Sequence, residues 1–232
     1  MSIEYIKGMK SYLLKKIKED PEIEKEVGEL IFGLASVPQN IKKFSEKSAA
    51  IGWFFTSESF LAGMKEAFDE SQDSLDRYMI AEIDSNYSKI RESLLKNHQN
   101  RQEILSVAFD LHDQQNWIAS IPLFLSQTEG IFSENVGALL FSEHEKRKLL
   151  LQERFKDKAD LYVPYLYTPF ESKIQFSAGI SSASPNKKMN GPNRNGILHG
   201  SRKHLDYGIK INSYKCISLL AYVSMVFTSI ES

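Results

Sequence analysis

The sequence predicts an all-α fold, a helical bundle with an N-terminal helical extension. Apolar residues recur at three- and four-residue steps in most segments of the 232-residue chain, and this is the spacing of one face of an α-helix. No stretch before residue 98 alternates apolar and polar residues, as a half-buried strand would. Hydrophobic residues make up 42% of the chain and charged residues 25%, which is ordinary for a folded globular protein.

The N-terminal region forms the predicted helical extension. An apolar patch over residues 51–55 is expected to fill the space between its helices. The polar run over residues 96–101 interrupts the helical pattern. We therefore expect an N-terminal helical region over residues 1–97 and a helical bundle over residues 98–232. The apolar stripes of the first region cover residues 3–17, 23–34, 60–68 and 75–94.

The second region continues the helical pattern. Its first two apolar stripes predict helices over residues 104–111 and 118–132. Ser142 and Glu145 have the spacing of a capping box, in which each side chain bonds a free backbone N–H at a helix start. This pattern predicts a third helix that runs towards Phe155.

The last helix contains the most apolar run of the chain, from Cys216 to Ile230. Asn212 and Ser213 are expected to cap it. Four polar side chains interrupt the run, and it is shorter than the roughly 20 residues that a bilayer requires. We expect a buried core helix in a cytoplasmic protein without a membrane span. The residues expected to face inward are Ile217, Leu220, Ala221 and Ser224.

Cys216 is the single cysteine of the chain. One cysteine excludes an intramolecular disulfide framework and any zinc site built on cysteine pairs, and it fits a reducing compartment. His199 and His204 are five positions apart, which suits a two-ligand helical metal site poorly. Phosphate loops of the Walker type and dinucleotide-binding glycine turns are absent from the sequence. We therefore expect no metal and no cofactor.

The segment from Asn193 to Gly200 combines Arg194, Asn195 and His199. A guanidinium stays protonated and matches phosphate oxygens with a fork of donors, while an imidazole exchanges protons near neutral pH. On a regular helix, Arg194 and His199 would point about 140° apart. We expect Arg194 at the start of a helix, where both side chains can turn towards one pocket.

Basic residues are concentrated around this segment. Between Ser182 and Lys215 there are seven basic residues and one acidic residue, a net charge of +6, although the whole chain carries −1. A basic island on a mildly acidic protein indicates a polyanionic partner, and the alternative is a solvated basic loop. The seven basic residues are Lys187, Lys188, Arg194, Arg202, Lys203, Lys210 and Lys215.

The pattern Arg194-Asn195-x-x-x-His199 resembles the Arg-x4-6-His signature of the HEPN superfamily, in which a polar residue often follows the arginine. The helical segment from Ser120 to Ile131 agrees with this resemblance, which covers roughly residues 98–230. It implies a small helical bundle, and many members of the superfamily are metal-independent RNA endonucleases. They act as toxins in toxin–antitoxin, phage-exclusion and other antiviral defence systems. Pairing of two motifs across a homodimer is common, and an antitoxin or a nucleotidyltransferase-type protein is a possible further partner.

The predicted function is metal-independent cleavage of RNA by its own 2′-hydroxyl. We expect His199 to act as acid and base, Arg194 to stabilise the phosphorane, and Asn195 to orient these groups. Glu129 borders an apolar stripe, where a buried carboxylate requires a cationic partner, and HEPN domains often place an acidic residue near the motif. The expected substrate-binding residues are Lys187, Lys188, Arg202, Lys203, His204 and Tyr207.

Two other readings of the sequence stay open. In the first, the chain is a catalytically inactive HEPN module that binds RNA, a nucleotide or a protein partner. In the second, it is a purely structural helical protein, in which the motif has no role. For His204 and Tyr207, the alternative to substrate binding is that they end the motif helix.

Overall fold

A computed structural model describes residues 40–156, 166–171, 174–181 and 191–231, with side chains to residue 228. Within these residues every regular element is helical and no strand occurs, which confirms the all-α prediction. The chain divides into two compact units, Met1–Ile41 and Lys42–Ser232. The second unit contains nearly all described residues.

In the second unit a helical segment ends at residue 50, and further helices follow it along the chain. Short 3-10 turns lie between several of the α-helices, among them η2, Gln175–Ser177, and η4, Arg202–His204. The α-helices are α3 Leu61–Glu70, α4 Gln72–Asn97, α5 Gln102–Asp113, α6 Trp117–Val136, α7 His144–Phe155, α9 Thr168–Glu171, α10 Arg194–Leu198 and α11 Lys210–Glu231.

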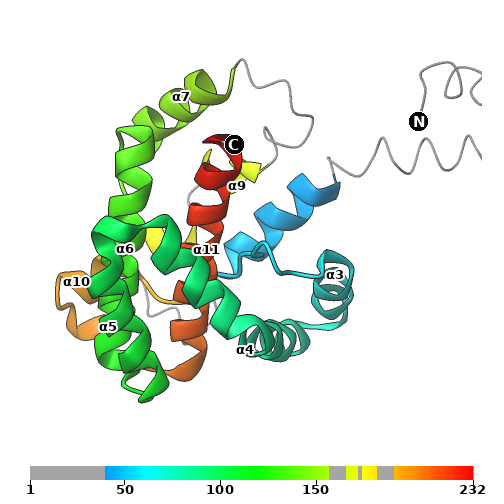
Figure 1. Ribbon diagram of the computed structural model, residues 1–232, viewed down its shortest axis with the longest axis vertical. Coiled ribbons are helices and arrows are strands. Elements are labelled where there is room, and N and C mark those ends of the chain that lie inside the picture. Colours follow the sequence, from blue (N-terminus) through cyan, green and yellow to red (C-terminus); the bar gives the residue numbers. More distant parts are fainter. Residues whose placement is uncertain (1–39, 157–165, 172–173, 182–190, 232) are drawn as a thin grey trace, which may run out of the picture. The chain divides into compact units, whose positions relative to one another are not determined.

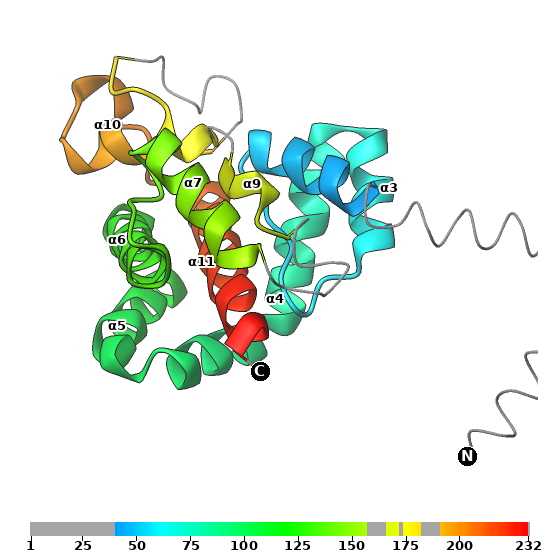
Figure 2. The ribbon, with the colours of Figure 1, turned by 90° about the horizontal axis from the view of Figure 1, so that it is seen from above.

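Helix α11 lies at the centre of this unit. It packs against α6 and α4, and α5 packs against α6 and α4 in turn (Figures 1 and 2). A helix that is surrounded by others must be apolar on most of its circumference. The predicted inward residues of α11 are all buried, and so are many on its other faces. Among the described residues, none of the helices combines the length and the apolar character that crossing a lipid bilayer requires.

The apolar patch over residues 51–55 is part of the core. Trp53, Phe54 and Phe55 are all buried. The centroids of the Phe54 and Phe55 rings lie 5.4 and 4.9 Å from that of Tyr222 in α11. The patch therefore packs against the C-terminal helix, and not only between N-terminal helices as predicted.

The division of the chain differs from the predicted boundary at residues 97 and 98. Helix α4 packs against α5 and α11, so residues 42–97 belong to the same compact unit as the helices that follow. The polar run over residues 96–101 marks only the turn between α4 and α5. The predicted helices over residues 3–17 and 23–34 lie outside the described residues.

Two predicted helix caps are wrong. Helix α7 begins after Glu143, which has a φ of 51° and makes no capping hydrogen bond with its side chain. The carbonyl of Ser142 instead accepts a hydrogen bond from Arg147 Nη1 at 2.8 Å. Helix α11 begins at Lys210, so Asn212 lies inside its first turn, where its amide donates to the carbonyl of Tyr207. The carboxylate of Glu145, the other half of the predicted box, contacts His144 Nδ1 at 3.0 Å.

Candidate active site

The predicted motif occupies a short helix, α10, with Arg194 as its first residue. Asn193 caps this helix, because its Oδ1 accepts a hydrogen bond from the N–H of Gly196 at 2.9 Å. Asn193 Nδ2 donates to the carbonyl of Gly179, which joins the cap to the preceding segment. The helix ends at His199, and Gly200 follows with a φ of 63°. The prediction that Arg194 begins a helix is confirmed.

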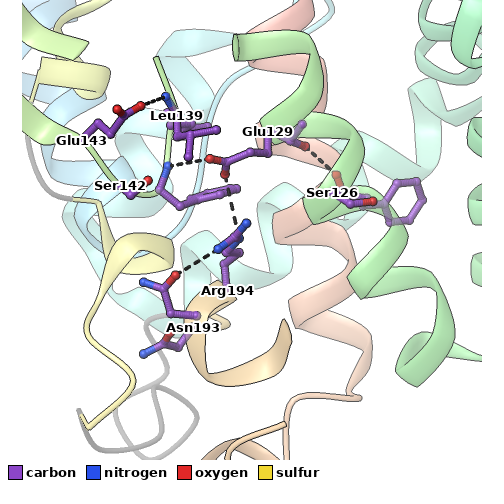
Figure 3. A network of polar contacts seen from close by, with 12 residues as sticks. Ser126, Glu129, Leu139, Ser142, Glu143, Asn193 and Arg194 are labelled. Carbon is purple, nitrogen blue, oxygen red and sulfur yellow. Dashed lines mark hydrogen bonds and ion pairs between the residues drawn. The ribbon is translucent and has the colours of Figure 1, made fainter. Parts of the chain in front are cut away.

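Arg194 points towards Glu129 of helix α6 (Figure 3). Arg194 Nε lies 3.9 Å from Glu129 Oε2, and the two side chains are 23% and 9% exposed. The guanidinium carbon of Arg194 also lies 5.7 Å above the ring of Phe141, a distance at which a cation is attracted to an aromatic face. The fold thus brings together two predicted catalytic residues that are distant in sequence.

The electrostatics of Glu129 are set by its burial. Burial raises the pKa of the Glu129 carboxyl above its usual value, and the charge of Arg194 opposes this rise only in part. The N–H of Phe141 donates weakly to Glu129 Oε1 at 3.5 Å. Within the described residues, neither Glu129 Oε2 nor Arg194 Nε has a hydrogen-bond partner. Both atoms are buried, so the 3.9 Å contact between them is a buried ion pair to which no hydrogen bond from a described residue adds.

Arg147 supports the site and was missed by sequence reasoning. It is 1% exposed, and its guanidinium donates to the carbonyls of Leu140, Ser142 and Phe170 at 2.6 to 2.8 Å. These bonds shape the turn after α6 that carries Phe141 to Arg194. One signal was present in the sequence, because Arg147 lies on the same four-residue spacing as Leu151 and Phe155, the buried face of α7.

Asn195 contacts Arg194 directly, and His199 does not. Asn195 Oδ1 accepts a hydrogen bond from Arg194 Nη1 at 3.2 Å, and Asn195 Nδ2 donates to the carbonyl of Ala178. His199 is exposed at the end of α10. Its side chain makes no hydrogen bond or ion pair with any described residue. The structure thus joins Glu129, Arg194 and Asn195 into one cluster, and His199 is exposed at the other end of α10 without a contact to that cluster. The expectation that Arg194 and His199 turn towards one pocket is therefore not met within the described residues of one chain, because Glu129 and Phe141 hold the guanidinium.

The predicted basic surface is described in part. Arg202 and Lys203 are exposed on η4, which follows α10 directly. Lys203 Nζ donates to the carbonyl of Ser181 at 3.3 Å. Lys187 and Lys188 lie outside the described residues. Two positive charges beside His199 are therefore available to a polyanion.

His204 is placed differently from the predicted substrate contact. It is 2% exposed, and its Nε2 lies 3.3 Å from the carbonyl of Ile180. Its ring packs so closely on Gly196 that a Cβ atom there would lie 2.2 Å from His204 Cδ2. The ring is enclosed because it packs from η4 against Gly196 of α10, and it is therefore not available as a contact for substrate.

Tyr207 also contacts protein. Its hydroxyl donates a 2.9 Å hydrogen bond to the carbonyl of Ile118 in the first turn of α6. That carbonyl would normally accept from the residue four positions later, which is Pro122 and has no N–H. Tyr207 thus supplies the hydrogen bond that Pro122 cannot, which is a structural role and not the predicted contact with substrate.

No family model, curated protein or solved structure matches this chain. The resemblance to the HEPN superfamily therefore rests on the sequence motif and on the helical pattern upstream of it.

Proposed function

We propose that this protein is a metal-independent RNA endonuclease of the HEPN type, with Arg194 and His199 as its catalytic residues. The observation that carries the proposal is the pairing of Arg194 with Glu129, at the start of the short helix that ends at an exposed His199. A held guanidinium and a free imidazole at the two ends of one short helix are two of the groups that RNA cleavage by 2′-hydroxyl attack requires.

The proposed reaction uses the nucleophile that RNA already contains. The 2′-oxygen attacks the adjacent phosphorus, its proton passes to a base, and the bond to the 5′-oxygen breaks as an acid protonates that oxygen. The products are a 2′,3′-cyclic phosphate and a free 5′-hydroxyl. Arg194 stabilises the added negative charge of the phosphorane, and Glu129 and Asn195 hold the guanidinium in position. His199 exchanges one of the two protons.

A second acid or base is needed, and a second copy of the chain is its proposed source. His199 faces solvent and has no partner within the described residues of its own chain, which suits a residue that meets its counterpart across a homodimer. Arg202 and Lys203 are exposed next to it and would contact the RNA backbone. An antitoxin or a nucleotidyltransferase-type protein is a further proposed partner, which would control the activity in a cytoplasmic defence system.

One observation favours a second function, an inactive module that binds RNA, a nucleotide or a protein. Arg194 is only 23% exposed, and it is engaged by Glu129, Asn195 and the ring of Phe141. An arginine with three protein contacts is suited to a structural role, in which it fixes the position of α10 and of the surface beside it. In that case the basic residues beside α10 would bind a partner without any chemistry.

The experiment that separates the two functions uses purified full-length protein and single-stranded RNA in the presence of EDTA. The endonuclease should leave 2′,3′-cyclic phosphate ends, and His199→Ala and Arg194→Ala should each lower the rate by about 100-fold or more. The matched control variants are His144→Ala and Arg77→Ala, which remove a histidine and an exposed arginine outside this cluster.

The same variants give a second readout in cells. Expression of the endonuclease in a bacterial host should arrest growth, and Arg194→Ala should restore it. Cleavage that requires Mg²⁺, or that persists in His199→Ala, would contradict the proposed mechanism. RNA binding without cleavage in the wild-type protein would favour the inactive module.

A further inference from the structure

A second hollow lies between helices α4, α5 and α11, built from other residues than the Arg194 site. Its volume is about 460 Å³, which is within the usual range for sites of small ligands. Its walls include three aromatic side chains, Tyr87, Trp117 and Tyr214, and its polar groups include Asp84 and Asp113. Aromatic faces combined with carboxylates are the chemistry that recognises an organic cation.

The hydroxyls of the two tyrosines are engaged by carboxylates, so their rings remain as the groups that can contact a ligand. Tyr87 donates its hydroxyl to Asp113 Oδ1 at 2.5 Å, and Tyr214 donates its hydroxyl to Asp84 Oδ1. A phenol that donates to a carboxylate has a more electron-rich ring, which attracts a cation more strongly. Asp84 Oδ2 has no hydrogen-bond partner among the described residues, so one carboxylate oxygen remains for a ligand.

His112 completes the wall and does not oppose a cation. It is 6% exposed, its Nδ1 lies 2.8 Å from Ser213 Oγ, and its ring stacks on Tyr87 with a centroid distance of 5.6 Å. Burial lowers the pKa of His112, so the imidazole is neutral at physiological pH. His112 lines the hollow, and its Nε2 makes no hydrogen bond within the described part of the chain.

The protein's own Lys210 shows that an ammonium group is accepted here. Lys210 Nζ lies 5.4 Å from the centroid of the Tyr214 ring, at the edge of the hollow. It makes no ion pair with Asp84 or Asp113, and its side chain is exposed. Asp113 already pairs with Arg91, whose Nη1 lies 2.9 Å from Asp113 Oδ2. A cation that is held only by one ring face can be displaced by a ligand that also reaches the carboxylate of Asp84.

We propose that this hollow binds a small organic ammonium ion, which is held by the faces of Tyr87, Trp117 and Tyr214 and by the carboxylate of Asp84. Lys210 occupies part of the site in the free protein, and it competes with the ligand.

The test is isothermal titration of the full-length protein with choline and with n-butylammonium, as a quaternary and a primary ammonium probe. The control ligand is 3,3-dimethyl-1-butanol, which has the shape of choline without its charge. At least one of the two cations should bind at millimolar concentration or below, about tenfold or more tightly than the neutral alcohol. Equal affinity for choline and the alcohol would show that the charge is not recognised and would overturn the proposal.

Three variants locate the binding in this hollow. Trp117→Ala and Asp84→Asn should each weaken the affinity for the cation by about fivefold or more. Asp84→Asn keeps an oxygen for the Tyr214 hydroxyl, so it tests the charge in a fold that thermal unfolding can verify. Lys210→Met should strengthen binding severalfold, whereas Lys148→Met, a control at an exposed lysine of α7, should not.

Three further results would each overturn the proposal. The first is no heat of binding with either cation in both the wild-type protein and Lys210→Met. The second is binding that Asp84→Asn leaves unchanged, and the third is an equal gain in Lys210→Met and Lys148→Met.

Discussion

Replacing Tyr207 with phenylalanine tests whether this residue supports the fold or contacts substrate. The Tyr207 hydroxyl donates to the carbonyl of Ile118 at 2.9 Å, and Pro122 has no N–H to offer that carbonyl. Tyr207→Phe removes only the hydroxyl, so the carbonyl loses this partner while the aromatic packing stays. The variant should therefore lower the free energy of unfolding without changing the shape of the site.

The size of the stability loss in Tyr207→Phe depends on how well water can reach the carbonyl of Ile118. A typical intramolecular hydrogen bond contributes about 1 kcal/mol, and a buried carbonyl left unpaired costs more. Ile118 is 61% exposed, so water can partly replace the tyrosine. We expect a loss of about 0.5 to 1 kcal/mol.

A double-mutant cycle with Pro122→Ala gives the sharpest form of this prediction. An alanine at position 122 restores an N–H that can donate to the carbonyl of Ile118 within the helix. In the Pro122→Ala background, Tyr207→Phe should cost less than about half of its effect in the wild-type protein. Urea unfolding of the four proteins, followed by circular dichroism, measures both values.

The reasoning is refuted if Tyr207→Phe costs the same in both backgrounds, since the hydroxyl would then not substitute for the missing N–H of Pro122. A large loss of ribonuclease activity in a variant with unchanged stability would point instead to the contact with RNA that the sequence predicted.

Two further predictions concern buried groups. Lys215 is 1% exposed, and burial lowers the pKa of its ammonium from 10.5 to about 8. As the pH rises, the folded state loses this proton before the unfolded state does, so the free energy of unfolding should rise between pH 8 and 10.5. Relative to Lys215→Met, the rise should reach up to about 3 kcal/mol. Urea unfolding over that pH range measures it. A pH-independent difference between the two proteins would contradict this. Gly196→Ala should cost about 1 to 3 kcal/mol of stability, because the new methyl group overlaps the buried ring of His204. His204→Ala should recover part of that loss in thermal unfolding, and no recovery would exclude this contact as the cause.

Most of the helices were predictable from the sequence because their stability depends on a local pattern. The apolar stripe over residues 75–94 lies within α4, and the stripe over 118–132 lies within α6. The patch over 51–55 was predictable as core for the same reason, since a run of large apolar side chains has to be buried. Its partner was not predictable, because Tyr222 in α11 is distant in sequence.

For the candidate site, too, some features were predictable from the sequence and others depended on packing. The motif from Arg194 to His199 and its place at a helix start followed from residue types and spacing. Glu129 was singled out as a carboxylate that needs a cation, and its distance from Arg194 was decided by the packing of α6 against α10. Arg147 escaped notice because a buried arginine is rare, and only its backbone partners reveal what it does.

By itself, the sequence determined that the chain is helical, that charge is concentrated around residues 182–215, and that an arginine, an amide and an imidazole share one short segment. These are properties of neighbouring residues, and local geometry alone relates them. Only the tertiary structure decided that Arg194 meets Glu129, that His204 and Tyr207 contact protein, and that Tyr87, Trp117 and Tyr214 surround a hollow. Such contacts join helices that are distant in sequence, and their geometry depends on how all the side chains of the core pack together.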